Sequence, residues 1–496
     1  MAGIGVKLNK IFEKDTVSSY LAGFAYSAMS TVTPMLVIIL NILLMGHFLK
    51  FDQLGFMERE LFSCTVLYIF IFALLTAAPF NSVLSKYMSD VIYEERYEDI
   101  RPCYYLGLIM NITLSSLVGI PFCLWEHFVG RVDVFFVFTG YCGYISLVLV
   151  FYSMIYLSIA KDYQRISLFF LIGMVEAFLL SLFLRFVMLW GIRESMLFAL
   201  VTGFFLTAFL EMGTVKRYFM KNSNRYKSVL RYFGKYWPLI LSNFFYILGL
   251  YVHNFVFWTT DMKLVVARSF VCCQPYDMAT CLAMFTNLSA TAIFISRVEM
   301  NFHDKYKEYS EAVIGGKGAD IDRAKKEMFR QLSSELMSLA RIQFIITAVV
   351  YLAAVVILPR FGFSSLTLRI YPCLVAGYFI IFIMYAEIIF LYYYNDLAGA
   401  ALTSLIFCLV TFLGSIVATH LTELWYGVGV VAGAFSGWSF AYFRLRFVER
   451  NLDAHIFCKG SLLKPGMGTQ PPSKIYDKKE QAADGTGEQR RISAEL

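Results

Sequence analysis

Long, nearly uninterrupted runs of apolar residues constrain this chain more than any other feature. A run of about 20 such residues can cross the hydrocarbon layer of a bilayer as a helix. We identify twelve runs, over residues 20–46, 62–86, 103–125, 133–159, 166–190, 194–215, 237–258, 276–298, 342–360, 370–394, 398–420 and 424–446. No segment has the alternating pattern of a membrane-barrel strand. The sequence therefore predicts an all-α integral membrane protein with about twelve transmembrane helices.

The composition agrees with this prediction. Only 16% of the 496 residues are charged, whereas soluble domains carry about 25%. Mean hydropathy is +0.62. If the N-terminus is cytoplasmic, 34 of the 43 lysine and arginine residues fall in inner segments and eight in outer loops. The positive-inside rule then places both termini in the cytoplasm. Because topology accounts for the net charge of +7, no nucleic-acid partner is predicted.

The segments outside the apolar runs have distinct compositions. Residues 1–19 are expected to form an amphipathic helix in the inner headgroup layer, because apolar and lysine side chains occupy separate faces of it. This segment lacks the apolar core of a signal peptide, and its lone G-x-G is not a dinucleotide site. The polar tail, residues 451–496, is expected to be cytoplasmic and largely disordered.

A repeated pattern divides the apolar runs into two halves. The first run contains "TPMLVIILN" and the seventh contains "WPLILSN". The second and eighth runs both end in a serine, a basic residue and then a mixture of aromatic and acidic residues. Six crossings return a chain to its starting side, so we expect parallel six-helix bundles, residues 20–220 and 221–450, related by a pseudo-two-fold axis along the membrane normal. Transporters built in this way bind substrate between the halves.

Four separated motifs resemble one family. They are the opening "MAGIGVKLNKIF", "YWPLILSNFFYILGLYVHNFVFW", "PYDMATCLAMF" and "SRVEMNFHDKYKEYSEAV". In this order they are similar to the PelG family of Pel exopolysaccharide transporters. That family is a branch of the flippase superfamily that also contains multidrug exporters and lipid-linked oligosaccharide flippases. The chain departs from the family pattern at His253 and Asn254, which replace an acidic residue and a lysine.

The resemblance implies a function and a set of partners. It implies export of a growing polymer of N-acetylated amino sugars, of the N-acetylgalactosamine type, across the cytoplasmic membrane. The implied partners are a cytoplasmic glycosyltransferase that uses a nucleotide sugar and other membrane subunits, one of them a sensor of cyclic di-GMP. No cofactor and no enzymatic activity are implied for this chain.

Ionisable side chains within the apolar runs are candidates for the transport pathway or for its coupling. Each costs about 2.5–3.5 kcal/mol to place at the middle of a membrane helix, so a retained one is a functional candidate. Glu176 is expected near mid-bilayer, either facing a wet cavity or bonded between helices. Arg185, nine residues on, falls on the opposite side of the helix and cannot pair with it; it either finds another partner or reaches the outer surface. Glu211, His253 and Asp277 are expected nearer the helix ends, close to water.

Glu387 is a second type of candidate because tyrosines surround it. A carboxylate next to aromatic rings suits a sugar, since rings stack on the apolar faces of pyranoses and oxygens accept hydroxyl protons. Tyr385 is the ring we expect to act with it. For Tyr392, Tyr393 and Tyr394 the alternative is an aromatic belt at the membrane interface.

The longest inner segment is expected to hold an amphipathic helix over residues 319–340, capped by Asp320. Its basic side chains are candidates for partner docking: Arg323, Lys325, Lys326 and Arg330. The helix either lies in the membrane plane on anionic lipid or binds the glycosyltransferase together with the basic loop 216–235. Its glycines lack the spacing of an ATP site.

The ten cysteines form no C-x-x-C or zinc-ligand pattern, and no metal is predicted. Cys272 and Cys273 fall in an outer loop, where oxidation is feasible, but the sequence assigns them no function.

Three rival functions stay open. A membrane-embedded glycosyltransferase would need a sizeable outer loop, and the outer loops here are short. A flippase for lipid-linked oligosaccharides would need a cationic cavity for pyrophosphate, and Arg185 is the one deep cation. A non-transporting scaffold of the synthase would also fit the basic inner loops. The driving force, whether protons, sodium or polymerisation, is not fixed by the sequence.

Overall fold

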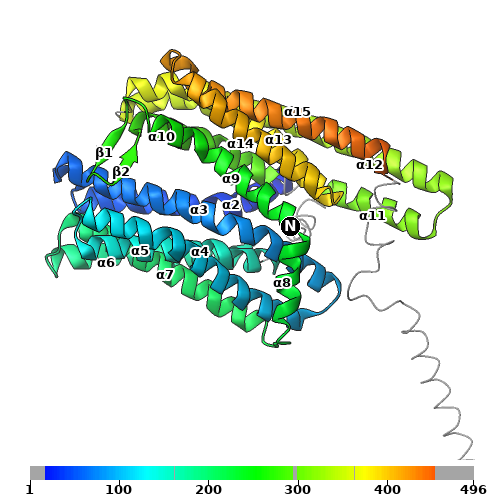
Figure 1. Ribbon diagram of the computed structural model, residues 1–496, viewed down its shortest axis with the longest axis horizontal. Helices are drawn as coiled ribbons and strands as arrows, with labels where there is room; N and C mark the ends of the chain where they lie inside the picture. Colours follow the sequence, from blue (N-terminus) through cyan, green and yellow to red (C-terminus); the bar gives the residue numbers. More distant parts are fainter. Residues whose placement is uncertain (1–16, 161, 294–298, 362, 453–496) are drawn as a thin grey trace, which may run out of the picture. The chain divides into compact units, whose positions relative to one another are not determined.

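The computed structural model describes residues 17–160, 162–293, 299–361 and 363–452 (Figure 1). The amphipathic helix expected over residues 1–19 and the expected disordered tail therefore lie almost wholly outside the described residues. The chain divides into two units, Met1–Phe443 and Arg444–Leu496. In the second unit α15 ends at Arg450, and Arg446 pairs with Glu449 at 2.6 Å.

Helices account for almost all regular structure in the described chain. Those of the first half are α2 (Val17–Phe48), α3 (Phe56–Tyr93), α4 (Ile100–Phe128), α5 (Val134–Ile159), α6 (Tyr163–Phe186) and α7 (Ile192–Tyr218). Those of the second half are α8 (Tyr226–Lys235), α9 (Trp237–Phe257), α10 (Gln274–Ile293), α11 (Glu299–Gly315), α12 (Gly318–Ile357), α13 (Ser365–Tyr393), α14 (Leu397–Ala418) and α15 (Val428–Arg450). Short 3-10 turns lie in several of the loops.

Each predicted apolar run coincides with one of these helices. Within the described residues, nine helices are long and apolar enough to cross a bilayer: α3, α4, α5, α6, α7, α9, α12, α13 and α14. The other three runs fall on α2, α10 and α15. The all-α, multi-pass membrane architecture is thus confirmed, and the count of twelve crossings stays a prediction.

The helices pack into two bundles. In the first, α5 packs against α3, α4 and α7, while α6 packs against α2 and α7. In the second, α9 packs along α14, and α13 packs against α10 and α12. The bundles contact each other through α3 with α9 and through α2 with α10. Each of these two contacts joins the first transmembrane run of one half to the second run of the other half.

The repeated asparagines of the two halves make different contacts. Asn41 of α2 donates to the Met174 sulfur at 3.5 Å within its own bundle. Asn243 of α9 donates to the Ala78 carbonyl of the other bundle at 2.6 Å. Both amides tie helices together, as such groups often do in membranes. The sequence repeat therefore marks equivalent positions but not equivalent interactions.

The helices α6 and α7 approach each other at paired glycines. A Cβ placed at Gly203 would lie 2.5 Å from the Gly173 carbonyl oxygen. We expect Gly203→Ala to lower the free energy of unfolding by about 1–3 kcal/mol, because the added methyl group overpacks this contact. Gly213, on the same helix, has open space where a Cβ would go, so Gly213→Ala should leave stability unchanged or raise it by up to about 1 kcal/mol. Thermal unfolding of both variants in detergent tests the pair; equal effects would contradict it.

The two ends of the bundles differ in character. At one end the strands β1 (Leu264–Val266) and β2 (Phe270–Cys272) form an antiparallel hairpin between α9 and α10. We call this the hairpin end. The opposite end, which we call the basic end, carries the loops after α3, α5 and α7, the helix α8, and the pair α11–α12 (Figure 1). Sequence patterning missed the hairpin because each strand has three residues, too few to show a period.

The basic helix α8 is fixed to the first bundle. Val229 is fully buried, and the Tyr232 hydroxyl donates to Asp90 of α3 at 2.8 Å. Burial, followed by this hydrogen bond to a carboxylate, raises the pKa of Tyr232 above its usual range. The hydroxyl therefore stays a donor at physiological pH.

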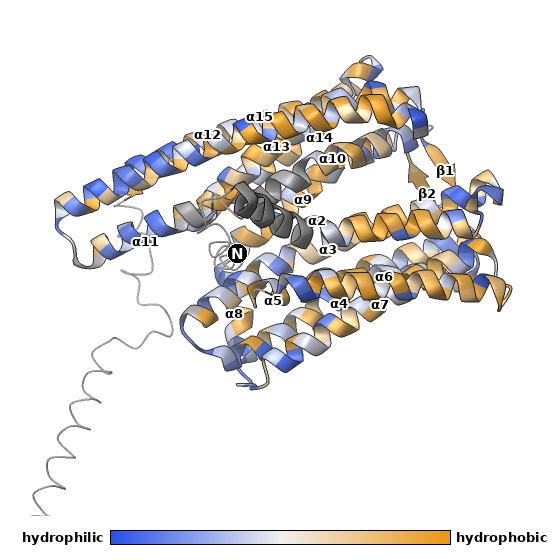
Figure 2. Cartoon of the chain, turned by 180° about the vertical axis from the view of Figure 1, so that it is seen from behind, coloured by the Kyte–Doolittle hydropathy of each residue, from blue (hydrophilic) through white to orange (hydrophobic). Residues whose placement is uncertain are grey.

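The helix α12 is longer than predicted and is oriented differently. Its 40 residues form one helix, about 60 Å long at 1.5 Å per residue. The amphipathic segment 319–340 is the first part of this helix and lies beside α11, where hydrophilic residues predominate (Figure 2). The same axis continues into the apolar part that crosses the bilayer. An orientation in the membrane plane is therefore wrong for residues 319–340. Asp320 is not the expected N-cap, because the helix begins at Gly318 after Lys317; its carboxylate lies in the first turn and accepts from the Lys317 backbone N–H at 3.3 Å.

Candidate functional site

Glu387 lies in the interior of the second bundle. Its side chain is 3% exposed, and Oε1 accepts from the Trp438 indole of α15 at 3.1 Å. The other oxygen, Oε2, has no hydrogen-bond partner among the residues that the structure describes. One carboxylate oxygen is thus held in place and the other is left for a group that enters the site.

Tyrosines line the helices next to Glu387. Tyr385 stacks on Tyr246 of α9 with ring centroids 4.9 Å apart. About two turns after Tyr385, Tyr392 is hydrogen-bonded through its hydroxyl to Ser242 at 2.7 Å. Tyr393 and Tyr394 contact Phe302, and Tyr394 stacks on Phe329 of α12. All three consecutive tyrosines thus contact other parts of the protein, Tyr392 and Tyr393 half-buried and Tyr394 buried, and the aromatic belt stays the alternative for them.

Glu211 lies in the interior of the first bundle, on α7. Its side chain is fully buried, and neither carboxylate oxygen has a hydrogen-bond partner in the described part of the chain. The expectation that it lies close to water is wrong, because hydropathy gives the depth of a residue along a helix but not the face it occupies.

Tyrosines from two neighbouring helices form the polar surroundings of Glu211. Tyr104 of α4, which interacts electrostatically with Glu211, stacks on Tyr152 of α5 at 5.5 Å. The Tyr152 hydroxyl is in turn hydrogen-bonded to that of Tyr156 at 2.7 Å. Glu211 in the first bundle and Glu387 in the second are therefore both buried near tyrosine rings with at least one oxygen unpartnered in the described chain, and Glu126 of α4 is a further buried acid with one unpartnered oxygen.

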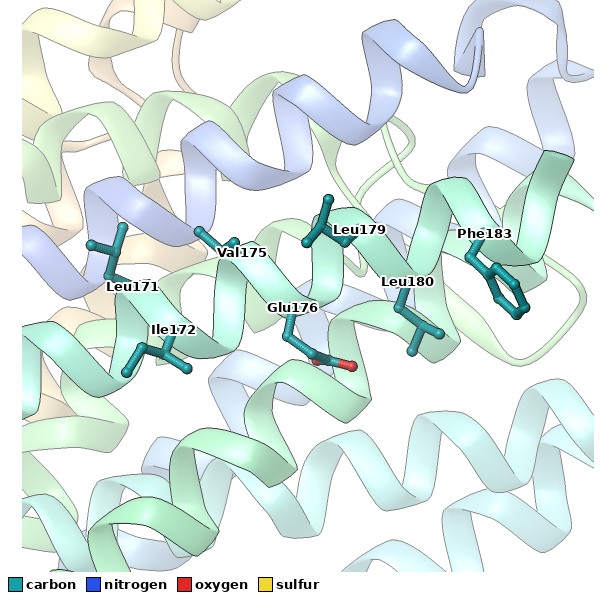
Figure 3. Close-up of a pocket in the computed structure, with 7 residues that line it drawn as sticks. All are labelled: Leu171, Ile172, Val175, Glu176, Leu179, Leu180 and Phe183. Atoms are coloured by element: carbon teal, nitrogen blue, oxygen red, sulfur yellow. The ribbon is translucent and has the colours of Figure 1, made fainter. Parts of the chain in front are cut away.

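Glu176 occupies a different kind of position. It is half-buried and lies in a groove of about 660 Å³ whose other lining residues are apolar (Figure 3). All seven lining residues belong to α6: Leu171, Ile172, Val175, Glu176, Leu179, Leu180 and Phe183. The side chain interacts with the Thr202 hydroxyl of α7, while Oε2 has no hydrogen-bond partner in the described chain. The groove is a feature of one helix surface, so it does not place Glu176 with Glu211 or Glu387.

Arg185 is bound to the turn that follows its own helix. Its Nη1 donates to the Trp190 carbonyl at 2.9 Å. In the described chain no ion pair joins it to Glu176, in agreement with their predicted separation around the helix. One guanidinium nitrogen of Arg185 is therefore directed at the turn after α6, while the group keeps its positive charge.

Asp277 organises the helix ends next to the hairpin. Its Oδ1 accepts from Asn254 at 2.7 Å and from the Trp258 indole at 2.9 Å, and Oδ2 accepts from the Cys273 backbone N–H at 2.9 Å. The carboxylate is 9% exposed. The expectation of a position close to water is wrong here too, because these donors hold it inside the protein.

His253 lies near this cluster and is fully buried, which also corrects its expected position close to water. Its Nδ1 is 2.9 Å from the Tyr276 hydroxyl. Its Nε2 has no partner among the described residues.

The hairpin end is where side chains of the two bundles interlock. Tyr68 of α3 lies parallel to Trp258 with ring centroids 5.2 Å apart. Its hydroxyl donates to the Val271 carbonyl at 2.8 Å and accepts from the Val271 N–H at 3.1 Å. Asp277 thus fixes Trp258, and Trp258 contacts the other bundle. No sequence pattern indicated this arrangement, because Tyr68 and Val271 are about 200 residues apart and in different halves.

The candidate docking residues lie on the outside of α12. Arg323, Lys326 and Arg330 are exposed, and Lys325 is half-buried. The opposite, apolar face of the helix is covered by protein, with Met328 fully buried. The exposed face therefore carries three of these basic side chains, with Arg323 paired with Asp320 at 3.5 Å and the exposed acids Asp322 and Glu327 beside them.

Solved structures similar to this chain are transporters. An outward-facing multidrug resistance MATE family transporter of the MOP superfamily covers 87% of this chain and 96% of its own, with a TM-score of 0.58 and 13% identity. The inward-facing form covers 86% and 99%, with a TM-score of 0.57 and 13% identity. A MOP superfamily transporter from Pyrococcus furiosus covers 86% and 96%, with a TM-score of 0.58 and 13% identity. The chain therefore has the two-lobed fold of MOP superfamily transporters.

The family follows from the sequence. Residues 1–457 match the family model described as "PelG: Putative exopolysaccharide Exporter (EPS-E)". The chain belongs to the PelG family and is a multi-pass membrane protein of an exopolysaccharide exporter family. No curated protein matches it.

Proposed function

We propose that this protein exports a growing polymer of N-acetylated amino sugars, Pel-like in type, across the cytoplasmic membrane. The observation that carries the proposal is the family match over residues 1–457 on a fold with two bundles. The polymer would pass between the bundles, which would separate at one end and then at the other. The concentration of lysine and arginine at the basic end supports a cytoplasmic location for that end and for both termini.

We assign coupling of transport to the two enclosed acids, Glu211 and Glu387. An ionised carboxylate without a partner is costly in a dry interior, so a proton or a cation has to neutralise each one while its bundle is closed around it. Hydration of the site in another state of the cycle would release that ion. Tyr385, next to Glu387, is the ring we assign to contact with the sugar. Glu176 stays a candidate for contact with substrate at the α6 surface, and His253 for the pathway.

Asp277 and Arg185 receive other roles in this proposal. Asp277 is saturated by donors that fix α9 and α10, and Arg185 is occupied by a carbonyl of its own turn. We assign both to the structure of the hairpin end. A flippase for lipid-linked oligosaccharides is disfavoured because it would need a cationic cavity for pyrophosphate, and Arg185, the one deep cation of the apolar runs, is directed at its own turn.

The experiment that tests export uses the purified full chain in lipid vesicles. Short oligomers of N-acetylgalactosamine, trapped on one side, should cross in protein-containing vesicles faster than in empty ones. A scaffold that does not transport would give equal rates. The same vesicles with an imposed proton or sodium gradient show which ion drives the passage, since only the coupled gradient should change the rate.

The exposed basic face of α12 is proposed to bind the glycosyltransferase. We expect the triple variant Arg323→Glu, Lys326→Glu, Arg330→Glu to lose co-purification with the glycosyltransferase and to lower polymer secretion from cells by at least about fivefold, because charge reversal at an interface adds repulsion to the lost attraction. Passage of short oligomers in vesicles should not change. Lys307→Glu on α11, which is also exposed, is the control and should keep co-purification. Secretion at the normal level from the triple variant would rule out this face as the dock.

A further inference from the structure

Two cysteines meet where the hairpin contacts α3. Cys64 belongs to α3 of the first bundle, and Cys272 ends β2, which precedes α10 of the second. The Cys64 thiol donates to the Cys272 sulfur at 3.3 Å. Both side chains are buried, at 1% and 3% exposure. A disulfide has an S–S distance of about 2.05 Å, so a small approach of the two sulfurs would be enough to join them.

The surrounding contacts hold this pair in register. One turn from Cys64, Tyr68 forms two hydrogen bonds with the backbone of Val271, the residue before Cys272. On the other side, Gln274 donates to the Glu60 carboxylate at 3.3 Å. The cysteine pair therefore lies in the middle of an ordered contact between the bundles, and the sulfurs face each other because the flanking residues fix both backbones.

We propose that Cys64 and Cys272 are a disulfide site that reversibly fastens the two bundles at the outer end. The co-reactant is a protein disulfide of the oxidising compartment outside the membrane. One thiolate attacks a sulfur of that disulfide and forms a mixed disulfide, and the second thiolate then displaces the co-reactant. One S–S bond forms in this protein, the co-reactant is reduced to two thiols, and the protons from Cys64 and Cys272 pass to its sulfurs. The reaction takes place when the bundles separate and expose the pair, and the bond is completed as they close.

A metal ion fits the same place less well. The ligand atoms of Glu60, Cys64 and Cys272 lie within 4.8 Å of one another, but a structural zinc site needs four ligands and this cluster holds three. Two thiolates and a carboxylate would also leave net negative charge around a divalent ion. The pair is surrounded by aromatic rings, with Tyr68 packed edge-on against Phe270 at 4.9 Å. A neutral disulfide suits such surroundings better than a charged complex.

The consequence of the bond follows from its position. It would join residues more than 200 positions apart across the contact that has to open if this end is to release polymer. The protein would be held with the outer end closed until the bond is reduced. The effect on transport rests on the proposed function, and the outer location rests on the proposed orientation, whereas formation of the bond depends on neither.

The bond can be detected after cleavage between the halves. A protease site inserted after Lys221, in the loop between α7 and α8, separates Cys64 from Cys272. The full-length chain in detergent is treated with diamide, cleaved, denatured with N-ethylmaleimide and run on a non-reducing gel. We expect the fragments to stay together and to separate with dithiothreitol. Cys64→Ser and Cys272→Ser should abolish the link, while Cys273→Ser, the adjacent buried cysteine, should keep it.

Two results of this gel would overturn the proposal. One is separation of the wild-type fragments after diamide. The other is protection of both thiols from N-ethylmaleimide by zinc chloride under native conditions, without any linked product, which would make the pair a metal site.

The effect on transport is measured with the same proteins in vesicles. Diamide should slow oligomer passage at least tenfold in wild type and Cys273→Ser, with recovery in dithiothreitol, and should leave Cys64→Ser unaffected. A link on the gel with equal passage before and after oxidation would overturn the fastening role. A link on the gel with no passage by any reduced variant would instead overturn the proposed function and leave the disulfide site intact.

Discussion

Replacing Glu211 with leucine is expected to lower export severalfold or more while making the protein more stable. The carboxylate is fully buried, with neither oxygen hydrogen-bonded in the described chain, so its removal eliminates a desolvation cost. Leucine has a similar volume and needs no partner, and we expect the free energy of unfolding to rise by about 1–3 kcal/mol. If Glu211 binds the coupling ion, export should fall by at least about tenfold, equivalent to about 1.4 kcal/mol in the rate-limiting barrier.

The two readouts together separate a coupling role from a structural one. A residue that only held helices together would lose stability and export at the same time. Polymer secreted by a complemented deletion strain gives the first quantity, and thermal unfolding in detergent gives the second. Glu194→Gln, in the first turn of the same helix and paired with Arg193, is the control and should keep secretion near the wild-type level. Normal secretion from Glu211→Leu would remove this residue from the mechanism.

The architecture was predictable from the sequence because it depends on one strong physical constraint. Backbone groups in hydrocarbon must be paired internally, so each apolar run had to be a helix. The structure starts α9 at Trp237, as predicted, and starts α5 at Val134, one residue later. The repeated Pro–Asn patterns also indicated the two halves correctly. An apolar run is a local signal, and the Pro–Asn pattern is a signal that recurs along the chain. Both kinds of signal can be recognised in a single sequence.

The candidate site was less predictable because it depends on which helix faces meet. Ranking by depth selected Glu387 and Glu176 as candidate intramembrane acids, and it placed Glu211 close to water. The structure instead encloses Glu211 among residues of other helices, represented by Tyr104. Ring pairs such as Tyr68 with Trp258 also form between the two halves. The periodicity of the sequence does not predict which rings will make contact. Whether a polar group is buried depends on tertiary packing, and the hydropathy of a single helix does not contain that information.

The error over α12 has a related cause. Its hydrophobic periodicity was recognised correctly, since Met328, Leu332 and Leu339 are all buried. An amphipathic helix with basic residues fits both a membrane surface and a protein surface, and periodicity does not distinguish the two. The partner of the apolar face, which includes Tyr394 stacked on Phe329, is visible only once α13 is folded against α12.

Glu387 provides the second large effect, because its hydrogen bond with Trp438 can be tested by a double-mutant cycle. We expect Glu387→Ala to lower secretion by at least about tenfold, since it removes the unsatisfied oxygen proposed to bind the coupling ion.

The second variant of the cycle is Trp438→Phe, which keeps an aromatic ring but removes the N–H that donates to Oε1. A hydrogen bond to a charged group contributes about 1.5–3 kcal/mol, so this variant should lower secretion by about tenfold or more. Its effect should disappear in the Glu387→Ala background, because the two residues act through one contact. Phe443, which also belongs to α15 and is exposed, provides the control: Phe443→Leu should secrete normally. If the fold losses of secretion in the two single variants multiply in the double variant, the two residues act independently. Trp438 would then act by packing alone and would not position the carboxylate.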